Sequence, residues 1–283
     1  MKYTINNFNE DFKDEDACLD FVFNLRYGKN YECPKCHKTG FYRVTDRKCY
    51  ACAWCSYQLH PLAGTIFHKS PTNLKDWFFA IFLMSKSKNG VSAKELERQL
   101  GVTYKCAWRM QRQIRMLMRS DNPDKLQGII ELDDSYVGGR HSGRRGRGAS
   151  GKTPVLGMVE RQGQVKADVV KNLKKKTVMP IIESTIDKDS TVYTDEFLSY
   201  TSLNKAGFEH DVVQHGIKEY VRGEVHTNTI EGFWSQLKRS LHGTYHSISP
   251  KHLQLYVDEF AWRYNHRKCQ IPFFGLLLEK VVL

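Results

Sequence analysis

The sequence predicts a mixed α/β protein in which two small modules precede one larger domain. Cysteines cluster within residues 31–66, helical periodicity runs through residues 72–120, and strand-like and helix-like segments alternate through residues 128–283. Such alternation is typical of helices packed on a mixed sheet, and not of a bundle or a sandwich. The 283 residues are 41% hydrophobic and 12% aromatic, which is enough to build a core and excludes wholesale disorder.

Charge and hydropathy indicate the kind of partner and the compartment. The net charge is +12, which favours an anionic polymer as partner. The longest apolar run, Trp77–Met84, is far below the roughly 18 residues of a membrane span, and the acidic N-terminal segment is unlike a signal peptide. We therefore expect a cytoplasmic protein without a membrane partner, whose reduced cysteines are available to bind metal.

Residues 1–30 predict a short polar, helical segment, and residues 31–68 predict a metal-binding module. Two C-x2-C knuckles, Cys33–Cys36 and Cys52–Cys55, are separated by 15 residues. Each knuckle places two thiolates on one tight turn, and four thiolates satisfy tetrahedral zinc. This spacing predicts a zinc ribbon whose Zn²⁺ is structural, because four protein ligands leave the ion no open position. A knuckle formed by Cys49 and Cys52 is an open alternative.

Residues 72–120 predict a helix-turn-helix. Ser92 and Glu95 form a capping box at the start of a short helix that Gly101 ends, and Thr103 can cap the next helix. The polar side of this second helix carries Lys105, Arg109, Arg112 and Arg115. A short helix, a glycine-containing turn and a basic second helix are the arrangement that binds in a major groove. The alternative is an ordinary helical hairpin that packs two domains together.

Residues 128–270 predict the largest domain, and residues 271–283 a C-terminal tail. Strands are expected at 128–134, 155–160, 165–171, 191–193 and 211–214, and helices at 177–186, 228–242 and 249–267. The run 138–152 contains six glycines and cannot bury apolar surface, so it predicts a mobile loop. Its basic residues, expected to contact DNA phosphates, are Arg140, Arg144, Arg145, Arg147 and Lys152.

Three acidic residues stand at the ends of elements in the largest domain. Asp133 closes the first strand, Asp195 follows the strand at 191–193, and Glu231 lies in the first turn of the next-to-last helix. One face of that helix is apolar, so Glu231 is directed away from the core, with Lys238 two turns further on. Each carboxylate alone is ordinarily a turn former or a helix-dipole partner. If the strands are neighbours, the three could hold two Mg²⁺ or Mn²⁺ ions for in-line phosphoryl displacement.

Several blocks of the sequence resemble one protein family. They are His226–Arg239 (His-Thr-Asn-Thr-Ile-Glu-Gly-Phe-Trp-Ser-Gln-Leu-Lys-Arg), Glu131–Gly139, Gly151–Pro154, Val192–Glu196, Gly243–His246, Ala63–Phe67 and Ser87–Ser92. These blocks resemble bacterial DDE insertion-sequence transposases of the branch that carries a zinc ribbon before an ISXO2-like, ribonuclease-H-like catalytic domain. The resemblance extends over residues 31–270.

The resemblance implies a ribonuclease-H-like mixed sheet and a catalytic triad of Asp133, Asp195 and Glu231 that binds Mg²⁺. Lys238 stands where the accompanying phosphate-contacting residue is expected. Asp134 stands where the family more often has Glu, so the two neighbouring aspartates could be confused. Asn228 is the alternative third residue, since some members use Asn. Glu231 is favoured because a carboxylate binds Mg²⁺ better than an amide does.

The predicted function is that of a DNA transposase. It would bind the terminal inverted repeats of its insertion sequence through the ribbon and the helix-turn-helix, and catalyse Mg²⁺-dependent cleavage and strand transfer into target DNA. A homodimer or larger assembly, associated with the nucleoid when bound to DNA, would pair the two ends. One alternative is a catalytically silent, domesticated transposase that regulates as a DNA-binding protein, although all three carboxylates are present. Another is a nuclease without strand transfer, which would not need two recognition modules.

Overall fold

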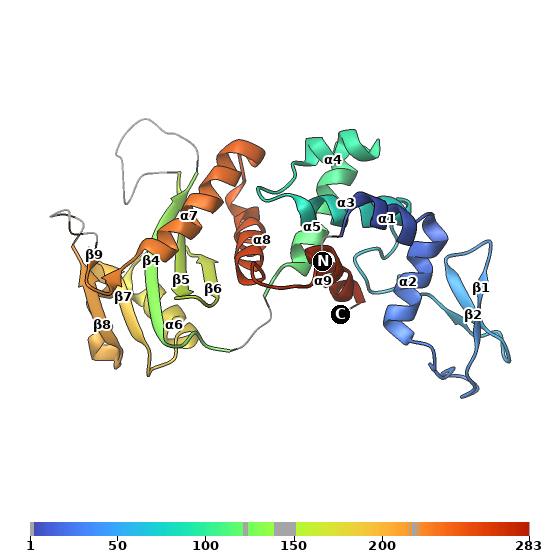
Figure 1. Ribbon diagram of the computed structural model, residues 1–283, viewed down its shortest axis with the longest axis horizontal. Coiled ribbons are helices and arrows are strands. Elements are labelled where there is room, and N and C mark those ends of the chain that lie inside the picture. The colour runs from blue at the N-terminus through green and yellow to red at the C-terminus, as the bar shows by residue number, and fades with distance from the viewer. Residues whose placement is uncertain are drawn as a thin grey trace. The chain divides into compact units, whose positions relative to one another are not determined.

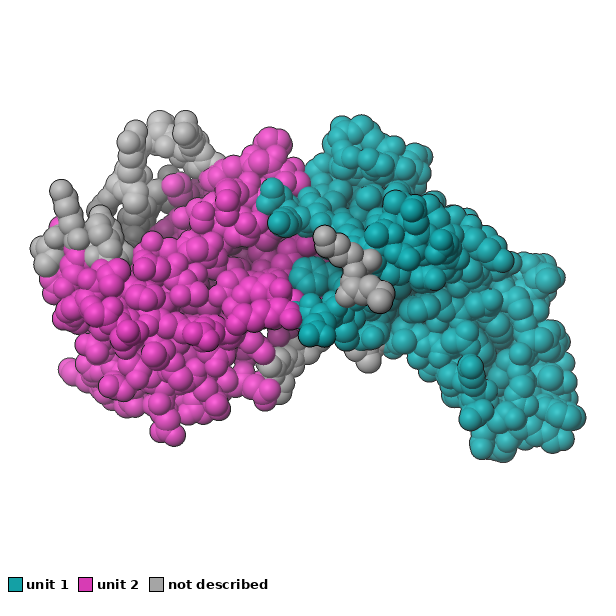
Figure 2. Space-filling view, in the orientation of Figure 1, with its two compact units in different colours: residues 1–117, 269–283 teal, residues 118–268 magenta. Residues whose placement is uncertain are grey.

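The computed structural model describes residues 3–120, 124–138, 151–214, 216, 219 and 221–282. The chain divides into two compact units, which Figure 2 colours separately. The first unit comprises residues 1–117 and 269–283, and the second comprises residues 118–268. Within the described ranges, no helix combines the length and the apolar character needed to cross a membrane.

Helices build most of the first unit (Figure 1). They are α1 (Ile5–Asp11), α2 (Glu15–Tyr27), α3 (Leu74–Lys86), α4 (Ala93–Leu100), α5 (Tyr104–Leu117), α9 (Phe273–Glu279) and η6 (Lys280–Val282). α4 begins after Ser92, whose hydroxyl accepts a hydrogen bond from the amide of Glu95. It ends at Gly101, where φ is 65°, a left-handed conformation that glycine adopts without strain. These are the cap residues that the sequence predicts.

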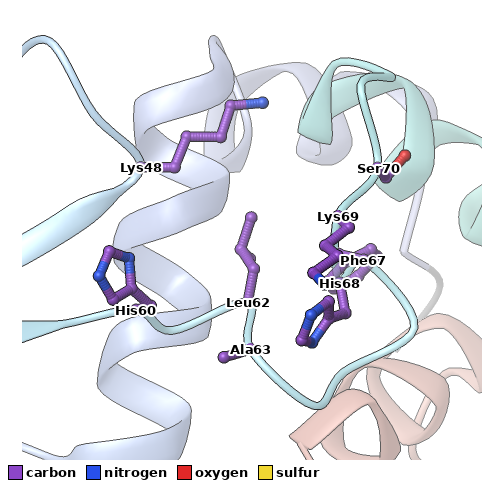
Figure 3. A pocket seen from close by; sticks show the side chains of 8 residues that line it. All are labelled: Lys48, His60, Leu62, Ala63, Phe67, His68, Lys69 and Ser70. Atoms are coloured by element: carbon purple, nitrogen blue, oxygen red, sulfur yellow. The ribbon is translucent and has the colours of Figure 1, made fainter.

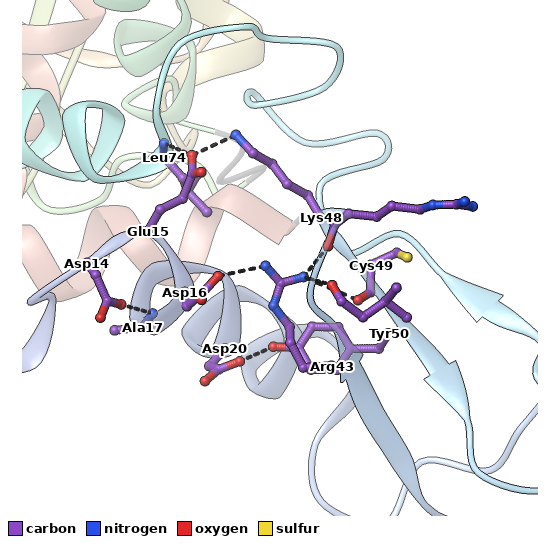
Figure 4. A network of polar contacts seen from close by, with 12 residues as sticks. Asp14, Glu15, Asp16, Ala17, Asp20, Arg43, Lys48, Cys49, Tyr50 and Leu74 are labelled. Atoms are coloured by element: carbon purple, nitrogen blue, oxygen red, sulfur yellow. Dashed lines mark hydrogen bonds and ion pairs between the residues drawn. The ribbon is translucent and has the colours of Figure 1, made fainter.

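A small antiparallel sheet follows α2, with β1 (Phe41–Val44), β2 (Cys49–Cys52) and β3 (Gln58–Leu59) in the order β1-β2-β3. Acidic side chains of α2 hold this sheet, as Figure 4 shows. Asp16 Oδ1 accepts a hydrogen bond from Arg43 Nη2 over 2.7 Å, and Asp20 accepts one from the hydroxyl of Tyr50. The acidic N-terminal segment is therefore part of the packing of the ribbon.

Glu15 extends this network to α3, the helix that precedes the two helices of the predicted helix-turn-helix. Its Oε1 accepts a hydrogen bond from Lys48 Nζ over 2.6 Å and another from the amide of Leu74, the first residue of α3, over 2.7 Å. Figure 4 shows Glu15 between these two donors. One carboxylate thus joins α2, the ribbon and α3 within the first unit.

The core of the first unit contains a cluster of aromatic rings that reaches α9. The rings of Tyr3 and Phe274 stack with centroids 5.0 Å apart, and Phe274 also contacts Phe8, Phe12 and Phe82. The sequence predicts a tail at residues 271–283, whereas the structure forms α9 there and packs it on α3. The helix is two turns long, and its apolar repeat is too short to predict without these contacts.

A five-stranded mixed sheet forms the centre of the second unit. Its strands are β4 (Ile129–Val137), β5 (Thr153–Glu160), β6 (Val165–Val169), β7 (Thr191–Asp195) and β8 (Glu209–Val213), in the order β6-β5-β4-β7-β8. β4 pairs antiparallel with β5 and parallel with β7, and β7 pairs parallel with β8. The predicted mixed α/β class, with its ribonuclease-H-like sheet, is confirmed.

Helices cover both faces of this sheet (Figure 1). Residues of α6 (Lys175–Thr185) pack with Ile130 and Leu132 on one face, while α7 (Asn228–Ser240) and α8 (Leu253–Asn265) pack with Val155 and Val159 on the other. The other elements among the described residues of this unit are η1 (Leu198–Tyr200), η2 (Asn204–Ala206), β9 (Val221–Arg222), β10 (Val225–His226), η4 (Leu241–Tyr245) and η5 (Pro250–His252). Because side chains alternate along a strand, the odd-numbered residues of β4 face α7 and the even-numbered ones face α6.

Candidate active site

The ribbon brings four cysteine sulfurs together. The Sγ atoms of Cys33, Cys36, Cys52 and Cys55 all lie within 4.8 Å of one another, and the Cys33–Cys55 and Cys36–Cys52 pairs are each 3.6 Å apart. Sulfurs bonded tetrahedrally to zinc at about 2.3 Å are separated by about 3.8 Å. The donor set and its spacing therefore fit a structural Zn²⁺. Cys49 lies on β2 outside this cluster.

The second helix of the predicted helix-turn-helix, α5, presents two of its predicted DNA-binding residues to solvent. Lys105 and Arg112 are exposed. Arg109 is half-buried, because its Nη2 donates a hydrogen bond to Ser70 Oγ over 2.8 Å and its guanidinium lies 5.7 Å from the ring centroid of Trp77. Arg109 therefore also stabilises the packing of α5 in the first unit.

Arg115 is not on the polar side of α5, and that expectation is wrong. Its side chain is buried, and its Nη1 donates to Gln111 Oε1 over 3.3 Å. The buried residues of α5 include Ala107, Gln111 and Arg115, which follow one another at intervals of four. This spacing defines a single helical face, so Arg115 belongs to the face that packs inward.

A cavity of about 310 Å³ opens in the first unit beside the ribbon. Its lining residues are Lys48, His60, Leu62, Ala63, Phe67, His68, Lys69 and Ser70. Figure 3 shows Lys48 and His60 on one side of the cavity and His68, Lys69 and Ser70 on the other. Local sequence patterns do not predict this basic cavity, because its basic side chains come from separate segments that meet only in the folded unit.

In the second unit, Asp133 and Asp195 lie near one another on neighbouring parallel strands. The pairing of β4 with β7 sets Glu131 opposite Tyr193, and each aspartate follows its member of this pair by two residues. The charge of Asp195 acts on Asp133. Residues two apart on a strand share a face, so both aspartates lie on the face of the sheet that α7 covers. The two aspartates predicted as ligands are thus brought near one another, although Asp133 lies in the middle of β4 and does not close the strand as the sequence predicts.

The environment of Asp133 disfavours the ionised form of its carboxyl group. Burial raises the pKa of Asp133 to about 7, and the charges of Asp134 and Asp195 contribute to this increase. Trp234 Nε1 acts in the opposite direction, since it donates a hydrogen bond to Asp133 Oδ2 over 3.1 Å. A nearby cation would favour the ionised form of such a carboxyl group.

Asp134 occupies the other face of the sheet. Its Oδ1 accepts a hydrogen bond from the hydroxyl of Tyr200 over 3.3 Å, and Tyr200 is part of the core cluster formed with α6. Burial, followed by the charge of Asp134, raises the pKa of Tyr200. The two neighbouring aspartates therefore have different surroundings, and only Asp133 faces α7.

Close packing seats α7 on the sheet beside Asp133. Gly157 of β5 is paired with Asp133, and a Cβ atom added to it would lie 2.5 Å from Trp234 Cζ2 and 3.0 Å from Ile230 Cδ1. Since real Cβ contacts are longer than this, glycine is what allows the indole to lie over β5 and reach Asp133.

The two candidates for the third ligand lie in the first turns of α7, and both are exposed. Glu231 Oε1 accepts a hydrogen bond from Thr227 Oγ1 over 3.0 Å. Glu231 precedes Trp234 by three residues, so their side chains are neighbours on the helix surface, whereas Asn228 is one turn further away. Lys238 is also exposed and follows Glu231 by two turns.

Glu131 is a residue of the site that the sequence analysis did not single out. It is fully buried and faces α7. Its Oε2 accepts hydrogen bonds from the amides of Thr229 at 2.7 Å and Ile230 at 3.1 Å. Its Oε1 accepts from Thr229 Oγ1 and from Arg161 Nε, each at 2.8 Å. The signal in the sequence was a glutamate between two apolar residues of the strand, Ile130 and Leu132.

The residues of the predicted basic loop are described only in part. Lys152 is half-buried and directly precedes β5. Arg140, Arg144, Arg145 and Arg147 lie outside the described residues.

Comparison with known proteins assigns the chain to a family. Residues 125–265 match the ISXO2-like transposase domain, and residues 13–58 match the transposase zinc-ribbon domain. An "Uncharacterized transposase-like protein" of Haemophilus influenzae is 36% identical over 113 residues, which are 39% of this chain and 90% of that protein. The chain belongs to the ISXO2-like transposase family.

A second relative matches almost the whole transposase. This "Uncharacterized protein in transposable element ISH50" of Halobacterium salinarum is 29% identical over 275 residues, which are 89% of this chain and 91% of that protein. The zinc-ribbon match begins at residue 13 and so includes α2, in agreement with the contacts that join α2 to the ribbon of this transposase. The predicted family and the zinc ribbon are confirmed.

Proposed function

We propose that this transposase binds the ends of its insertion sequence and cuts and joins DNA there in a Mg²⁺-dependent reaction. The observation that carries the proposal is the position of Asp133 and Asp195, which lie near one another on paired parallel strands, with Asp133 in contact with the helix that bears Glu231. In a transposase-family domain, this arrangement supports a catalytic site formed by the three carboxylates.

Asp133, Asp195 and Glu231 would hold two Mg²⁺ or Mn²⁺ ions, because hard divalent cations prefer carboxylate oxygens. The raised pKa of Asp133 supports this assignment, since a bound cation would stabilise its ionised form. When bound, such a pair of ions supplies charge stabilisation for the attacking and leaving oxygens of an in-line phosphoryl displacement. Glu231 is proposed over Asn228 because it is the surface neighbour of Trp234, which contacts Asp133.

The side chains of the chain would orient the carboxylates and the DNA. Trp234 would hold Asp133 through its Nε1 hydrogen bond, and Thr227 would orient Glu231 through its hydroxyl. Lys238, on the exposed face of α7, would contact a DNA phosphate. The basic residues proposed to hold further phosphates are Arg140, Arg144, Arg145, Arg147 and Lys152. Such contacts position DNA without reading its sequence.

The first unit would recognise the terminal inverted repeats. Lys105 and Arg112 are exposed on α5, and Arg109 would join them if DNA displaced its contact with Ser70. Lys69 lies at the basic cavity beside the ribbon (Figure 3), where it would contact the DNA backbone. Binding through these cations would weaken as salt concentration rises. A homodimer or larger assembly would hold the two ends of the element together.

The test uses purified protein, Mg²⁺ and a labelled duplex that carries the ends of the element encoding it. We expect cleavage at the end and joining to a target duplex by wild type, and loss of both in Asp133→Ala, Asp195→Ala and Glu231→Ala. Glu183→Ala, which removes an exposed carboxylate of α6, is the matched control and should retain activity.

Each alternative function has a distinct result in this assay. Zinc-dependent binding of the duplex without cleavage would support a DNA-binding regulator. Cleavage without joining would support a nuclease. Activity in Glu231→Ala together with its loss in Asn228→Ala would move the third ligand to Asn228.

A further inference from the structure

We propose that Glu131 is the positioning residue of the candidate metal site. Its buried carboxylate fixes the N-terminus of α7, and therefore Glu231, over the strand that bears Asp133. The inference rests on the proposed function, because it concerns the same three carboxylates.

Glu131 is bound by more donors than ordinary packing of a strand residue requires. Its two oxygens accept the four hydrogen bonds described above, and His226 Nδ1 lies 3.2 Å from Oε1. A fully buried carboxylate is unfavourable unless it is paired and hydrogen-bonded. The amides of Thr229 and Ile230 belong to the first turn of α7, so Glu131 acts as a helix cap contributed by a distant strand.

Two contacts from the same strand fix one turn of α7. Glu131 binds the amide of Ile230, and Asp133 accepts the hydrogen bond from Trp234. Two residues of a strand extend about 7 Å, and the four residues from Ile230 to Trp234 rise about 6 Å along a helix. The two spacings match, so this turn of α7 runs along β4. Glu231 lies within this turn.

Arg161 connects Glu131 to the strand that bears the second aspartate. Its Nε donates to Glu131, and its guanidinium lies 5.0 Å from the ring centroid of Tyr193 on β7. Tyr193 precedes Asp195 by two residues and shares its face of the sheet. The Glu131–Arg161 pair therefore contacts β4, β7 and α7, the three elements that bear the candidate ligands.

The test measures metal binding and catalysis separately in Glu131→Gln. Mn²⁺ binding is followed by the electron paramagnetic resonance signal of the free ion, and end cleavage is followed as kcat and KM for the duplex. We expect Mn²⁺ affinity to fall about tenfold and kcat about 100-fold, as for other groups that orient metal ligands. The KM for DNA should stay within about twofold of wild type, because a residue that orients only the metal ligands leaves DNA binding intact.

The matched control is Glu224→Gln. Glu224 Oε2 lies 3.7 Å from Arg161 Nη1, but its side chain is 86% exposed, and exposed ion pairs contribute little. This variant should bind Mn²⁺ and cut DNA as wild type does. Amide hydrogen exchange at Thr229 and Ile230 should accelerate in Glu131→Gln alone, because only Glu131 binds these amides.

If Glu131→Gln does not fold, a milder variant tests the same inference. Thr229→Val removes one hydroxyl donor to Glu131 and keeps the shape of the side chain. It should weaken Mn²⁺ binding about threefold, a smaller effect than that of Glu131→Gln, since the carboxylate and its other three hydrogen bonds remain. Unchanged Mn²⁺ affinity and kcat in this variant would then overturn the inference.

The outcomes distinguish the inference from the function on which it rests. Wild-type Mn²⁺ affinity and kcat in folded Glu131→Gln would overturn the positioning role. Mn²⁺ binding that depends on Asp133 and Glu131 in a protein that cuts no DNA would overturn the proposed function and support the positioning role. A wild type that binds no Mn²⁺ would overturn both.

Discussion

Trp234 lies so close to Gly157 that its Cζ2 atom would be 2.5 Å from a Cβ at that position. The indole passes over the glycine and donates its hydrogen bond to Asp133, the residue paired with Gly157 across the sheet. Because Gly157 on β5 has no side chain, Trp234 on α7 can reach the carboxylate of Asp133 on β4.

Gly157→Ala should therefore displace α7. We expect a loss of about 1–3 kcal/mol in the free energy of unfolding, which is typical of overpacking, and a lower rate of DNA cleavage. Gly232→Ala, on the exposed side of the same helix with no atom within 4 Å of the added Cβ, should stabilise the protein by up to about 1 kcal/mol. Urea unfolding of both variants measures this, and equal effects would contradict the packing argument.

Trp234→Phe keeps an aromatic ring and removes the donor to Asp133. Because that hydrogen bond lowers the pKa of Asp133, its loss should raise the pKa further and move the acidic limb of the cleavage profile to higher pH at subsaturating Mg²⁺. The rate at pH 7 should fall about tenfold, as a hydrogen bond to a charged group contributes about 1.5 kcal/mol. An acidic limb at the wild-type pH would show that the indole does not act on Asp133.

Asp133→Asn should stabilise the protein at alkaline pH when no Mg²⁺ is added. The pKa of Asp133 is about 7 in the folded chain and about 3.9 in an unfolded one, so the folded state binds the extra proton. Wild type therefore loses stability relative to the variant as pH rises from about 4 to 7. The variant should exceed wild type by about 2–4 kcal/mol at pH 8 and match it near pH 4.

Urea unfolding without added divalent ions, repeated across this pH range, tests the effect. Addition of Mg²⁺ at pH 8 should stabilise wild type more than Asp133→Asn, because the cation binds the ionised carboxylate. A stability difference between the two proteins that is the same at pH 4 and pH 8 would argue against a raised pKa at Asp133.

Loss of zinc should impair DNA recognition by the first unit and leave metal binding by the second unit unchanged. Cys36→Ser removes one of the four clustered sulfurs, so we expect loss of zinc and at least a tenfold weaker affinity for the inverted repeat, with Mn²⁺ affinity unchanged. Cys49→Ala, outside the cluster, should retain one zinc per chain. Metal analysis and fluorescence anisotropy with a labelled repeat measure both, and loss of zinc from Cys49→Ala would implicate Cys49 in the site.

Local patterns in the sequence were sufficient to predict most elements and the zinc ligands. The two knuckles place Cys33, Cys36, Cys52 and Cys55 on short turns, and the observed cluster contains these four. The helix that bears Glu231 follows from its apolar repeat, and Ile230, Trp234 and Leu237 are buried as that repeat requires. In each case the pattern that makes the prediction lies within one short stretch of the sequence.

Contacts between distant segments were not predictable in the same way. Glu131 binds the amide of Thr229, 98 residues further along the chain, and a sequence alone does not show which strand a helix caps. The choice between Asp133 and Asp134 likewise depends on which face of β4 meets α7. Arg115 was placed on the wrong side of its helix because a charged residue was assumed to face solvent, whereas the helical phase buries it.

Because α9 packs in the aromatic core of the first unit, this core can be completed only after the last residues of the chain have been synthesised. Phe274 contributes to the same aromatic core as Phe8 and Phe12, but it is translated after the entire second unit. A nascent or prematurely terminated chain that stops before Phe273 lacks part of that core. Such fragments would carry an incompletely packed first unit, so under the proposed function they would compete poorly with finished molecules for the ends of the element.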